Sequence, residues 1–241
     1  MKLSRYKRDL PVSYALGATL VYELLKTHPE LIQRVFLRKN IKPGDDLILL
    51  IENLRARQIE VIESPKAFNV LDAKENCLMI AEFQKPRTVL ATTPNEPQLV
   101  LVNPSDAGNL GTIMRSAAAF GFRDIAIVTP AVDYLNPKTI RASMGAVFHL
   151  NIQEYTSFDV YCASQPTRTL YAFMLDENAT KLPDIKLNSR DFALIFGNEA
   201  SGLPKSYAAV AQPVLIPQTS SVDSLNLSVA TSIALYHFRQ K

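Results

Sequence analysis

The sequence predicts an α/β protein with two domains, a smaller α/β sandwich at the amino terminus and a parallel-sheet domain at the carboxyl terminus. Helical and extended patterns alternate along the whole chain, which favours the α/β class. Extended segments in the second half are almost continuously apolar, as in parallel sheets covered on both faces. A length of 241 residues corresponds to one or two domains, and 47% hydrophobic with 20% charged residues is an ordinary globular composition.

A proline-rich segment marks the domain boundary. Residues 84–97 read QKPRTVLATTPNEP, with three prolines. Proline removes a backbone donor and disfavours helix in the residue before it. We therefore predict a first domain at 1–90, a linker at 91–97 and a second domain at 98–241.

Before the linker, Leu16, Leu20 and Leu24 recur at helical spacing, and Pro65 follows the potential N-cap Ser64. The expected elements are a helix at 13–26, an apolar stretch at 35–37, a helix opening at the 43–44 turn, a strand at 59–62, a short helix from 65 and a buried strand at 77–83.

After the linker, Gly121 stops a helix in the usual C-terminal position. We expect strands at 99–102, 124–128, 170–174, 192–196 and 214–216, and helices at 109–120, 136–146, 157–164, 204–210 and 224–238. The first strand, helix and second strand form a right-handed βαβ unit. Ligands of parallel sheets bind at the carboxyl ends of the strands, so the loops after the strands are the candidate site.

Charge is distributed unevenly although the net charge is only +3. Residues 1–42 carry nine Lys and Arg against three Asp and Glu, whereas the remaining chain has a net charge of −3. A basic amino-terminal region suits contact with phosphates, and it also suits a merely solubilising surface.

Neither a metal site nor a membrane span is expected. Cys77, Cys162 and three scattered histidines match no zinc or disulfide spacing. No apolar run reaches the roughly 18 residues of a span. Residues 12–25 behind a basic start mimic a secretory signal, but Glu23 interrupts them and no cleavage site follows. These features predict a cytoplasmic protein.

The loop after the first strand of the second half, residues 103–115, contains Asn109 and Arg115 but neither G-x-G-x-x-G nor G-K-[ST]. Asn109 suits a plain helix N-cap, and Arg115 suits a surface salt bridge. Arg115 also has apolar neighbours, which favours bidentate recognition of a phosphate or carboxylate.

Two further loops follow strands in the second half. In the loop 197–204, two glycines flank Glu199 and would let the backbone approach a ligand. In the loop 216–229, Asp223 or Ser224 suits a helix cap. The dense polar run around them also offers many uncharged hydrogen bonds to a neutral or zwitterionic cofactor.

Three ordered motifs carry a resemblance. N-L-G-x-x-x-R-S-A starts at Asn109, F-G-N-E-x-x-G-L starts at Phe196, and I-P at 216–217 is followed after six residues by S-L-N-L-S-V-A. With the R-A-S-M-G-A stretch at 141–146, residues 97–241 resemble the SpoU/TrmH family (SPOUT superfamily) of RNA ribose 2′-O-methyltransferases. The amino-terminal part resembles the ribosomal-protein-like substrate-binding domain of many members.

The resemblance implies an S-adenosylmethionine-dependent homodimer with a carboxyl-terminal trefoil knot. It assigns five residues to the active site: Asn109, Arg115, Glu199, Ser224 and Asn226. It assigns four to the cofactor: Gly197, Asn198, Ile216 and Leu225. The family commonly has methionine and glycine where this chain has Gln218 and Ser220, so Ser220 would have to accept a glycine-like backbone geometry.

The expected reaction is an in-line methyl transfer without a metal, in which Arg115 fixes the target phosphate and stabilises the developing oxyanion. Asn109 and Glu199 would orient Arg115, while Ser224 and Asn226 would shape the cofactor end. Ribosomal RNA is the favoured substrate. The alternative substrate is transfer RNA. The alternative classes of protein are an antibiotic-resistance methylase, a non-catalytic RNA-binding adaptor and a dehydrogenase-like enzyme.

Overall fold

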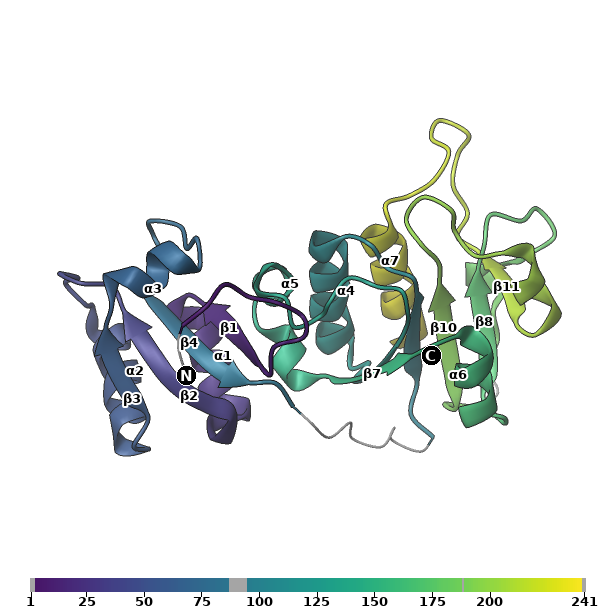
Figure 1. Ribbon diagram of the computed structural model, residues 1–241. Coiled ribbons are helices and arrows are strands. Elements are labelled where there is room, and N and C mark those ends of the chain that lie inside the picture. The colour runs from purple at the N-terminus through teal and green to yellow at the C-terminus, as the bar shows by residue number, and fades with distance from the viewer. Residues whose placement is uncertain (1–2, 87–94, 188, 240–241) are drawn as a thin grey trace. The chain divides into compact units, whose positions relative to one another are not determined.

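The computed structural model describes residues 3–86, 95–187 and 189–239, and its chain forms two compact units (Figure 1). The first unit comprises Met1–Arg87 and Asp133–His149, and the second comprises Thr88–Val132 and Leu150–Lys241. The predicted α/β class is confirmed. Most of the expected linker at 91–97 lies outside the described residues. Residues 133–149, expected within the second domain, group with the first unit.

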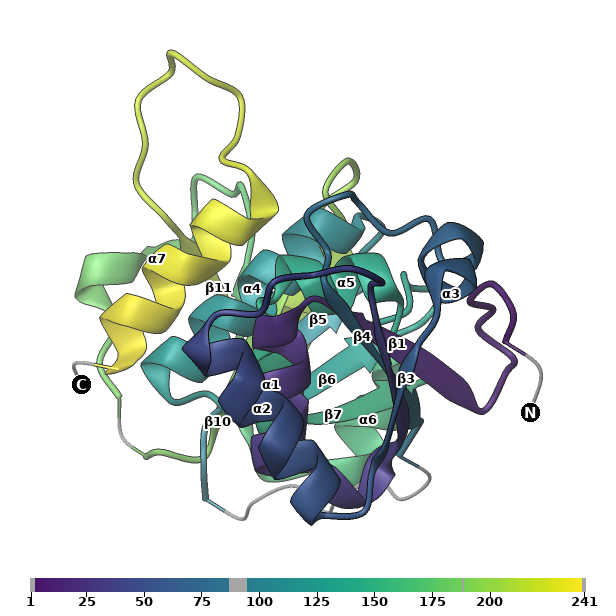
Figure 2. The same ribbon diagram turned by 90° about the vertical axis from the view of Figure 1, so that its left-hand side faces the viewer.

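The first unit contains a four-stranded sheet in the order β1-β4-β2-β3, in which only β2 and β3 are parallel. Its amino-terminal elements are β1 (Val12–Leu16), α1 (Ala18–Thr27), η1 (Pro29–Leu31), β2 (Ile32–Leu37), α2 (Asp45–Ala56), β3 (Glu60–Glu63), α3 (Pro65–Val70) and β4 (Met79–Gln84). Helices α1 and α2 lie side by side (Figure 2).

The expected helix at 13–26 was wrong in its first turn. Residues 12–16 form β1, which pairs with β4, and Gly17 at φ 125 separates this strand from α1. The leucine spacing was helical from residue 18 onward only. Residues 12–16 are extended because they pair with β4, a strand more than sixty residues away in the chain.

The 133–149 segment contains α5 (Pro137–Ala142) and η2 (Ala146–His149) and packs into the first unit through specific contacts. The buried Ser13 hydroxyl donates to the Leu135 carbonyl at 2.5 Å. The rings of Phe83 and Phe148 meet edge to face at 5.6 Å. Phe148 is buried, so the segment completes the core of this unit.

The second unit is built on a seven-stranded, entirely parallel sheet in the order β7-β6-β5-β10-β8-β11-β9. Its elements are β5 (Gln98–Val102), α4 (Ala107–Phe120), β6 (Asp124–Val128), β7 (Asn151–Tyr155), α6 (Phe158–Ser164), β8 (Thr169–Phe173), β9 (Thr180–Lys181), η3 (Leu182–Asp184), β10 (Phe192–Phe196), η4 (Lys205–Ala209), β11 (Gln212–Leu215) and α7 (Leu227–Arg239). The strand order does not test the trefoil knot, which stays a prediction.

Both faces of the parallel sheet are covered. On one face, Phe158 and Tyr161 of α6 and Tyr207 of η4 join a core of alternate strand residues. On the other, Phe238 of α7 contacts Phe192, and α4 lies beside α7 (Figure 1). The expectation of covered strands is confirmed, although β7 and β9 were missed. Within the described ranges, no helix has the length and apolarity to cross a lipid bilayer.

Candidate active site

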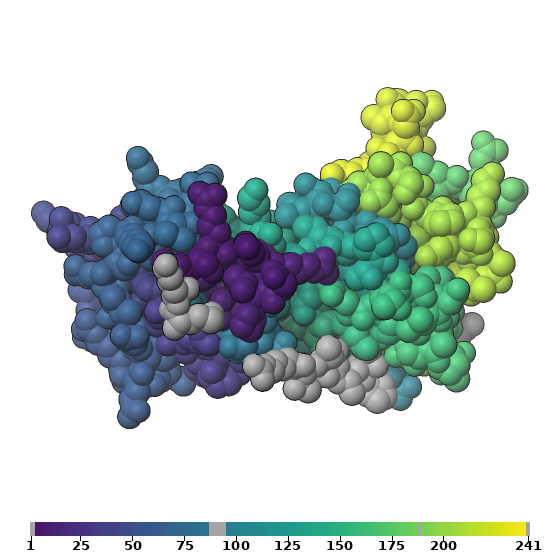
Figure 3. Space-filling model, viewed as in Figure 1, coloured from purple at the N-terminus to yellow at the C-terminus, as the bar shows by residue number. Residues whose placement is uncertain are grey.

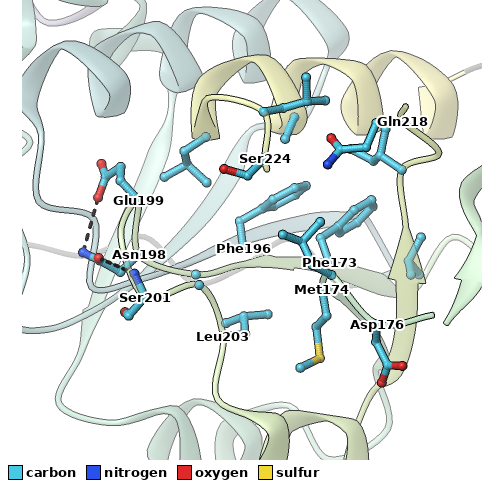
Figure 4. Close-up of a pocket in the computed structure, with 18 of the residues that line it drawn as sticks. Phe173, Met174, Asp176, Phe196, Asn198, Glu199, Ser201, Leu203, Gln218 and Ser224 are labelled. Carbon is cyan, nitrogen blue, oxygen red and sulfur yellow. Dashed lines mark hydrogen bonds between the residues drawn. The ribbon is translucent and has the colours of Figure 1, made fainter. Parts of the chain in front are cut away.

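A cavity of about 690 Å³ lies at the carboxyl ends of β8, β10 and β11. Figure 4 shows Phe173 and Phe196 in its wall, with Gln218 and Ser224 on one side and Leu203 on the other. The two phenylalanine rings stack at 4.3 Å. Six of the expected site residues line this cavity: Gly197, Asn198, Glu199, Ile216, Ser224 and Leu225. The site therefore lies where parallel sheets bind ligands.

The loop 197–203 folds back on itself at its two glycines. The Gly202 amide donates to the Asn198 carbonyl at 3.0 Å, and Gly202 adopts a φ of +65. A Cβ on Gly197 would lie only 2.2 Å from the Gly202 carbonyl carbon. The fold of this loop therefore requires glycine at position 197. The close approach of a ligand, which the sequence suggested as the reason for this glycine, is not needed to explain it.

Glu199 fastens this loop to the loop that opens α4. Its carboxylate accepts bonds from the Ser105 hydroxyl at 2.8 Å, the Ser105 amide at 3.1 Å and the Asp106 amide at 3.2 Å. Burial favours a higher pKa for Glu199, but the hydrogen bonds from Ser105, its own backbone and Asp106 outweigh burial and leave the pKa below its ordinary value. Glu199 is thus held as an anion.

Asn198 adds a second set of ties. Its side-chain amide donates to the Asn103 carbonyl at 2.8 Å, and its side-chain oxygen accepts the amides of Ala200 at 2.9 Å and Ser201 at 3.3 Å. Asn198 thereby connects β10 to the end of β5 while closing its own turn. Its side chain is occupied by the protein, so any contact to a cofactor would come from its backbone.

Asn109 and Asn226 extend the network to the last helix. Asn109 donates to Glu199 at 3.4 Å and accepts from the Asn226 side chain at 3.1 Å. Asn226 caps α7 by accepting the Ser228 amide at 2.9 Å. The N-cap of α4 is Asp106, which accepts the Asn109 amide at 2.7 Å. The sequence-based candidates for these caps, Asn109 for α4 and Asp223 or Ser224 for α7, were wrong.

Arg115 lies apart from this network. It occupies the third turn of α4, and its side chain is exposed. Within the described part of the chain its guanidinium has no hydrogen bond or ion pair. The salt-bridge interpretation of Arg115 therefore finds no support, and the expected orientation of Arg115 by Asn109 and Glu199 can act only through the helix that they anchor.

Ser105 and the segment after β8 belong to the site but were not predicted from the sequence. Ser105 supplies two of the bonds to Glu199. Residues 173–178 form one wall of the cavity. The strand at 170–174 was predicted, so the rule that ligands bind beyond the carboxyl ends of parallel strands could have identified this loop.

Known proteins are similar to this chain in sequence and in structure. Residues 96–236 match the SpoU rRNA Methylase family. The chain is 28% identical over 227 residues to the 23S rRNA (guanosine(2553)-2′-O)-methyltransferase RlmP of Bacillus subtilis, covering 92% of this chain and 86% of that protein. It is 35% identical over 145 residues to an uncharacterized tRNA/rRNA methyltransferase of Synechocystis, of which it spans 53%.

Among solved structures, the AdoMet-bound rRNA methyltransferase of Sinorhizobium meliloti superimposes with a TM-score of 0.81 at 26% identity, covering 95% of this chain and 87% of that one. The similarity therefore includes both units of the chain.

Proposed function

Because the chain belongs to the SpoU rRNA methylase family, we propose that it transfers a methyl group from S-adenosylmethionine to a ribose 2′-hydroxyl in structured RNA, with ribosomal RNA favoured. The observation that carries this proposal is the meeting of three distant segments: residues 197–203 and 216–225 line one cavity, and residues 103–109 are joined to them through the hydrogen bonds of Ser105 with Glu199 and of Asn109 with Asn226.

The cavity fits the cofactor in size and in chemistry. Its volume of about 690 Å³ lies within the usual range for small-molecule sites. Apolar side chains such as Phe173, Phe196 and Leu203 offer a wall for an adenine ring, and main-chain groups at Gly197, Ile216 and Leu225 would hold its polar edges. When bound, S-adenosylmethionine supplies an electrophilic methyl group on a positively charged sulfur.

The protein's own contribution is positioning. Glu199 and Asn109 fix the start of α4, the helix that carries Arg115. The exposed Arg115 guanidinium would take the target phosphate and stabilise negative charge that develops on the sugar oxygen. Glu199 is a poor proton acceptor, because donors already surround its carboxylate and its pKa is lowered.

The decisive test is Arg115→Ala, with Arg115→Lys as the matched variant. Methyl transfer to RNA should fall by about 100-fold or more in Arg115→Ala, while calorimetry should give an unchanged affinity for S-adenosylmethionine. Lysine keeps the charge without the planar fork and should restore little activity. Equal loss of cofactor affinity or of folding in Arg115→Ala would contradict this assignment.

The substrate class is tested in the cell. Deletion of the gene should remove a ribose methylation from ribosomal RNA, and we place this reaction in the cytoplasm. Loss of a transfer RNA methylation instead would identify the alternative substrate. Loss of no methylation, with RNA binding intact, would favour the non-catalytic adaptor. Calorimetric binding of a nicotinamide cofactor in preference to S-adenosylmethionine would favour the dehydrogenase.

The first unit is proposed as the RNA-binding region. It carries 17 Lys and Arg against 12 Asp and Glu, a net charge of +5, whereas the second unit carries 9 against 11, a net charge of −2. Lys39 and Lys42 are exposed in this unit. Substitution of both lysines by glutamate should weaken RNA binding and flatten its salt dependence, whereas Lys181→Glu in the second unit should not.

Deletion of residues 1–90 is a poorer test of this proposal, because it also removes the packing partner of Phe148, Phe83.

A homodimer is proposed on the exposed face of α7. Val229, Ile233 and Tyr236 recur at helical spacing with exposed fractions of 47%, 39% and 54%, and an exposed apolar stripe of this kind favours burial against a partner. A second copy is the partner that the family resemblance implies. Ile233→Glu should shift the protein from dimer to monomer in sedimentation velocity; an unchanged sedimentation coefficient would exclude this face.

A further inference from the structure

The 216–226 loop differs from the 197–203 loop at its tip, where residues 219–222 have no hydrogen bond to any other part of the second unit that the structure describes. Residues 217–224 are all exposed, and the tip stands out from the surface (Figures 1 and 3). At its two ends, Ile216, Ser224 and Leu225 line the cavity. The two ends of the loop must therefore be held close enough together for Ile216, Ser224 and Leu225 to line one cavity.

One side-chain bond joins the two sides of the loop, and a second lies between neighbours at its tip. The Gln218 amide nitrogen donates to the Asp223 carbonyl at 3.2 Å, and the Thr219 and Ser221 hydroxyls are 3.2 Å apart. The first bond closes the loop across its base, directly before Ser224. Ser220 is not among the described residues with positive φ, so the glycine-like geometry expected of it does not occur.

Gln218 also lines the cavity (Figure 4). Its amide nitrogen is used by Asp223, but its side-chain oxygen accepts no hydrogen bond from any residue that the structure describes. A side-chain amide oxygen has two acceptor positions. S-adenosylmethionine carries donors of the matching kind: an adenine amino group, ribose hydroxyls and an ammonium group.

We propose that Gln218 is a cofactor-binding residue, which closes the base of the 216–226 loop through its nitrogen and accepts a hydrogen bond from the cofactor through its oxygen. The methionine that the resemblance implies at this position has no donor to close the loop, and its sulfur is only a weak acceptor. On this proposal the two changes compensate each other. The side-chain bond of Gln218 closes the loop, so that a backbone turn with glycine at position 220 is no longer needed. This inference rests on the proposed cofactor.

The test is Gln218→Met, which restores the family's residue at similar length, with Gln212→Met as the control. Gln212, the first residue of β11, is also exposed and donates to the Thr180 hydroxyl at 3.2 Å, but it does not line the cavity. Loss of about one hydrogen bond at each end of the amide should raise the calorimetric Kd for S-adenosylmethionine about tenfold in Gln218→Met. Gln212→Met should leave it unchanged.

A second measurement needs no cofactor. Thermolysin cuts before exposed apolar residues, and Val222 at the loop tip is 53% exposed. Cleavage there in the cofactor-free protein should be several-fold faster in Gln218→Met and Gln218→Glu, since both lack the donor to Asp223. Unchanged cleavage with an unchanged Kd would overturn the inference while leaving the proposed function intact. Failure of the unmodified protein to bind S-adenosylmethionine would overturn the proposed function itself.

Discussion

The 197–203 and 216–226 loops face the same cavity, but the residues between their ends are held differently. The first loop is tied across the sheet by Glu199 and Asn198 to residues 103–106, more than ninety positions away in the chain. The second is tied to a distant residue only at its end, where Asn226 donates to Asn109; among residues 217–224 the bonds that the structure shows join neighbours, such as Gln218 and the Asp223 carbonyl. A residue that bonds to a distant segment must match a partner fixed by the fold, so few residue types can replace it. A loop that is closed by bonds between neighbours can be formed by several different sequences.

This difference bears on where the chain departs from the pattern that the resemblance implies. Gln218 and Ser220, the two departures named from the sequence, both lie in the locally closed loop. In the distantly tied loop, the F-G-N-E motif is intact from Phe196 to Glu199. The comparison predicts that substitutions in the first loop cost far more than substitutions in the second.

Gly197→Ala should have the largest effect. The new Cβ would lie 2.2 Å from the Gly202 carbonyl carbon and 2.5 Å from the Leu203 nitrogen, both backbone atoms that no rotamer change can move away. We expect the free energy of unfolding to fall by about 3 kcal/mol and S-adenosylmethionine binding to be lost. Denaturant unfolding and calorimetry measure the two effects.

The control for this variant is Gly44→Ala. Gly44 has a φ of −75, and a Cβ there would meet nothing within 4 Å. Its stability should change by less than about 1 kcal/mol. If Gly197→Ala were as stable as Gly44→Ala, the loop would not be closed on itself as the structure shows.

Much of this architecture could be predicted from the sequence, because the information was local. The apolar run 192–196 and the helix stop at Gly121 both lie where they were expected. Strand β1 was missed because Leu16, its last residue, continues the helical spacing of Leu20 and Leu24 in α1. Residues 133–149 group with the first unit through contacts such as the bond from Ser13 to Leu135, which spans 122 positions. Periodicity within a window cannot register such contacts.

In the site, too, features with a local sequence pattern could be predicted and features that depend on distant contacts could not. The three motif loops were found because they stand after strands, and Ser224 and Leu225 line the cavity as expected. The sequence could not show that Ser105 would supply two donors to Glu199, since serine in a loop has no distinctive pattern. It also could not show that Arg115 would be exposed, because its apolar neighbours turn to the other side of α4.

Glu199→Gln should have the second-largest effect. A neutral amide keeps the shape but loses the charge that Ser105 and Asp106 stabilise. We expect a loss of about 1.5 kcal/mol at neutral pH. Because the pKa of Glu199 is lowered by folding, the stabilisation by its charge is present above the pKa of the unfolded chain and is lost as the pH falls through the folded value.

The measurement compares denaturant unfolding of the parent and the variant between pH 7 and pH 3.5. The gap between them should be widest near neutral pH and should narrow below about pH 4.5, the ordinary pKa of a glutamate. A gap that stays constant or widens in acid would show that the carboxylate charge does not fasten this loop.

Asp106→Ala tests the far end of the same tie. Its carboxylate caps α4 by accepting the Asn109 amide at 2.7 Å, and loss of such a cap costs about 1 kcal/mol. The Asp106 amide that donates to Glu199 is backbone and remains. Stability should therefore fall by less than in Glu199→Gln, as measured by denaturant unfolding. Asp106→Asn should recover most of the loss, because asparagine caps as well as aspartate; if it did not, capping would not be the role of Asp106.

Ser220→Gly should have the smallest effect, although it restores the residue that the family commonly has. Ser220 has no positive φ to relieve, so glycine gains nothing in the folded loop and adds freedom to the unfolded chain, at a cost of about 0.5 kcal/mol. The cofactor Kd should stay within about twofold, because Gln218 still closes the base of the loop. In the double variant Gln218→Met with Ser220→Gly, the glycine turn becomes useful, and cofactor affinity should recover part of what Gln218→Met alone loses. Strictly additive affinities would mean that the two positions act independently, and the local closure of this loop would then not be the property that separates it from its neighbour.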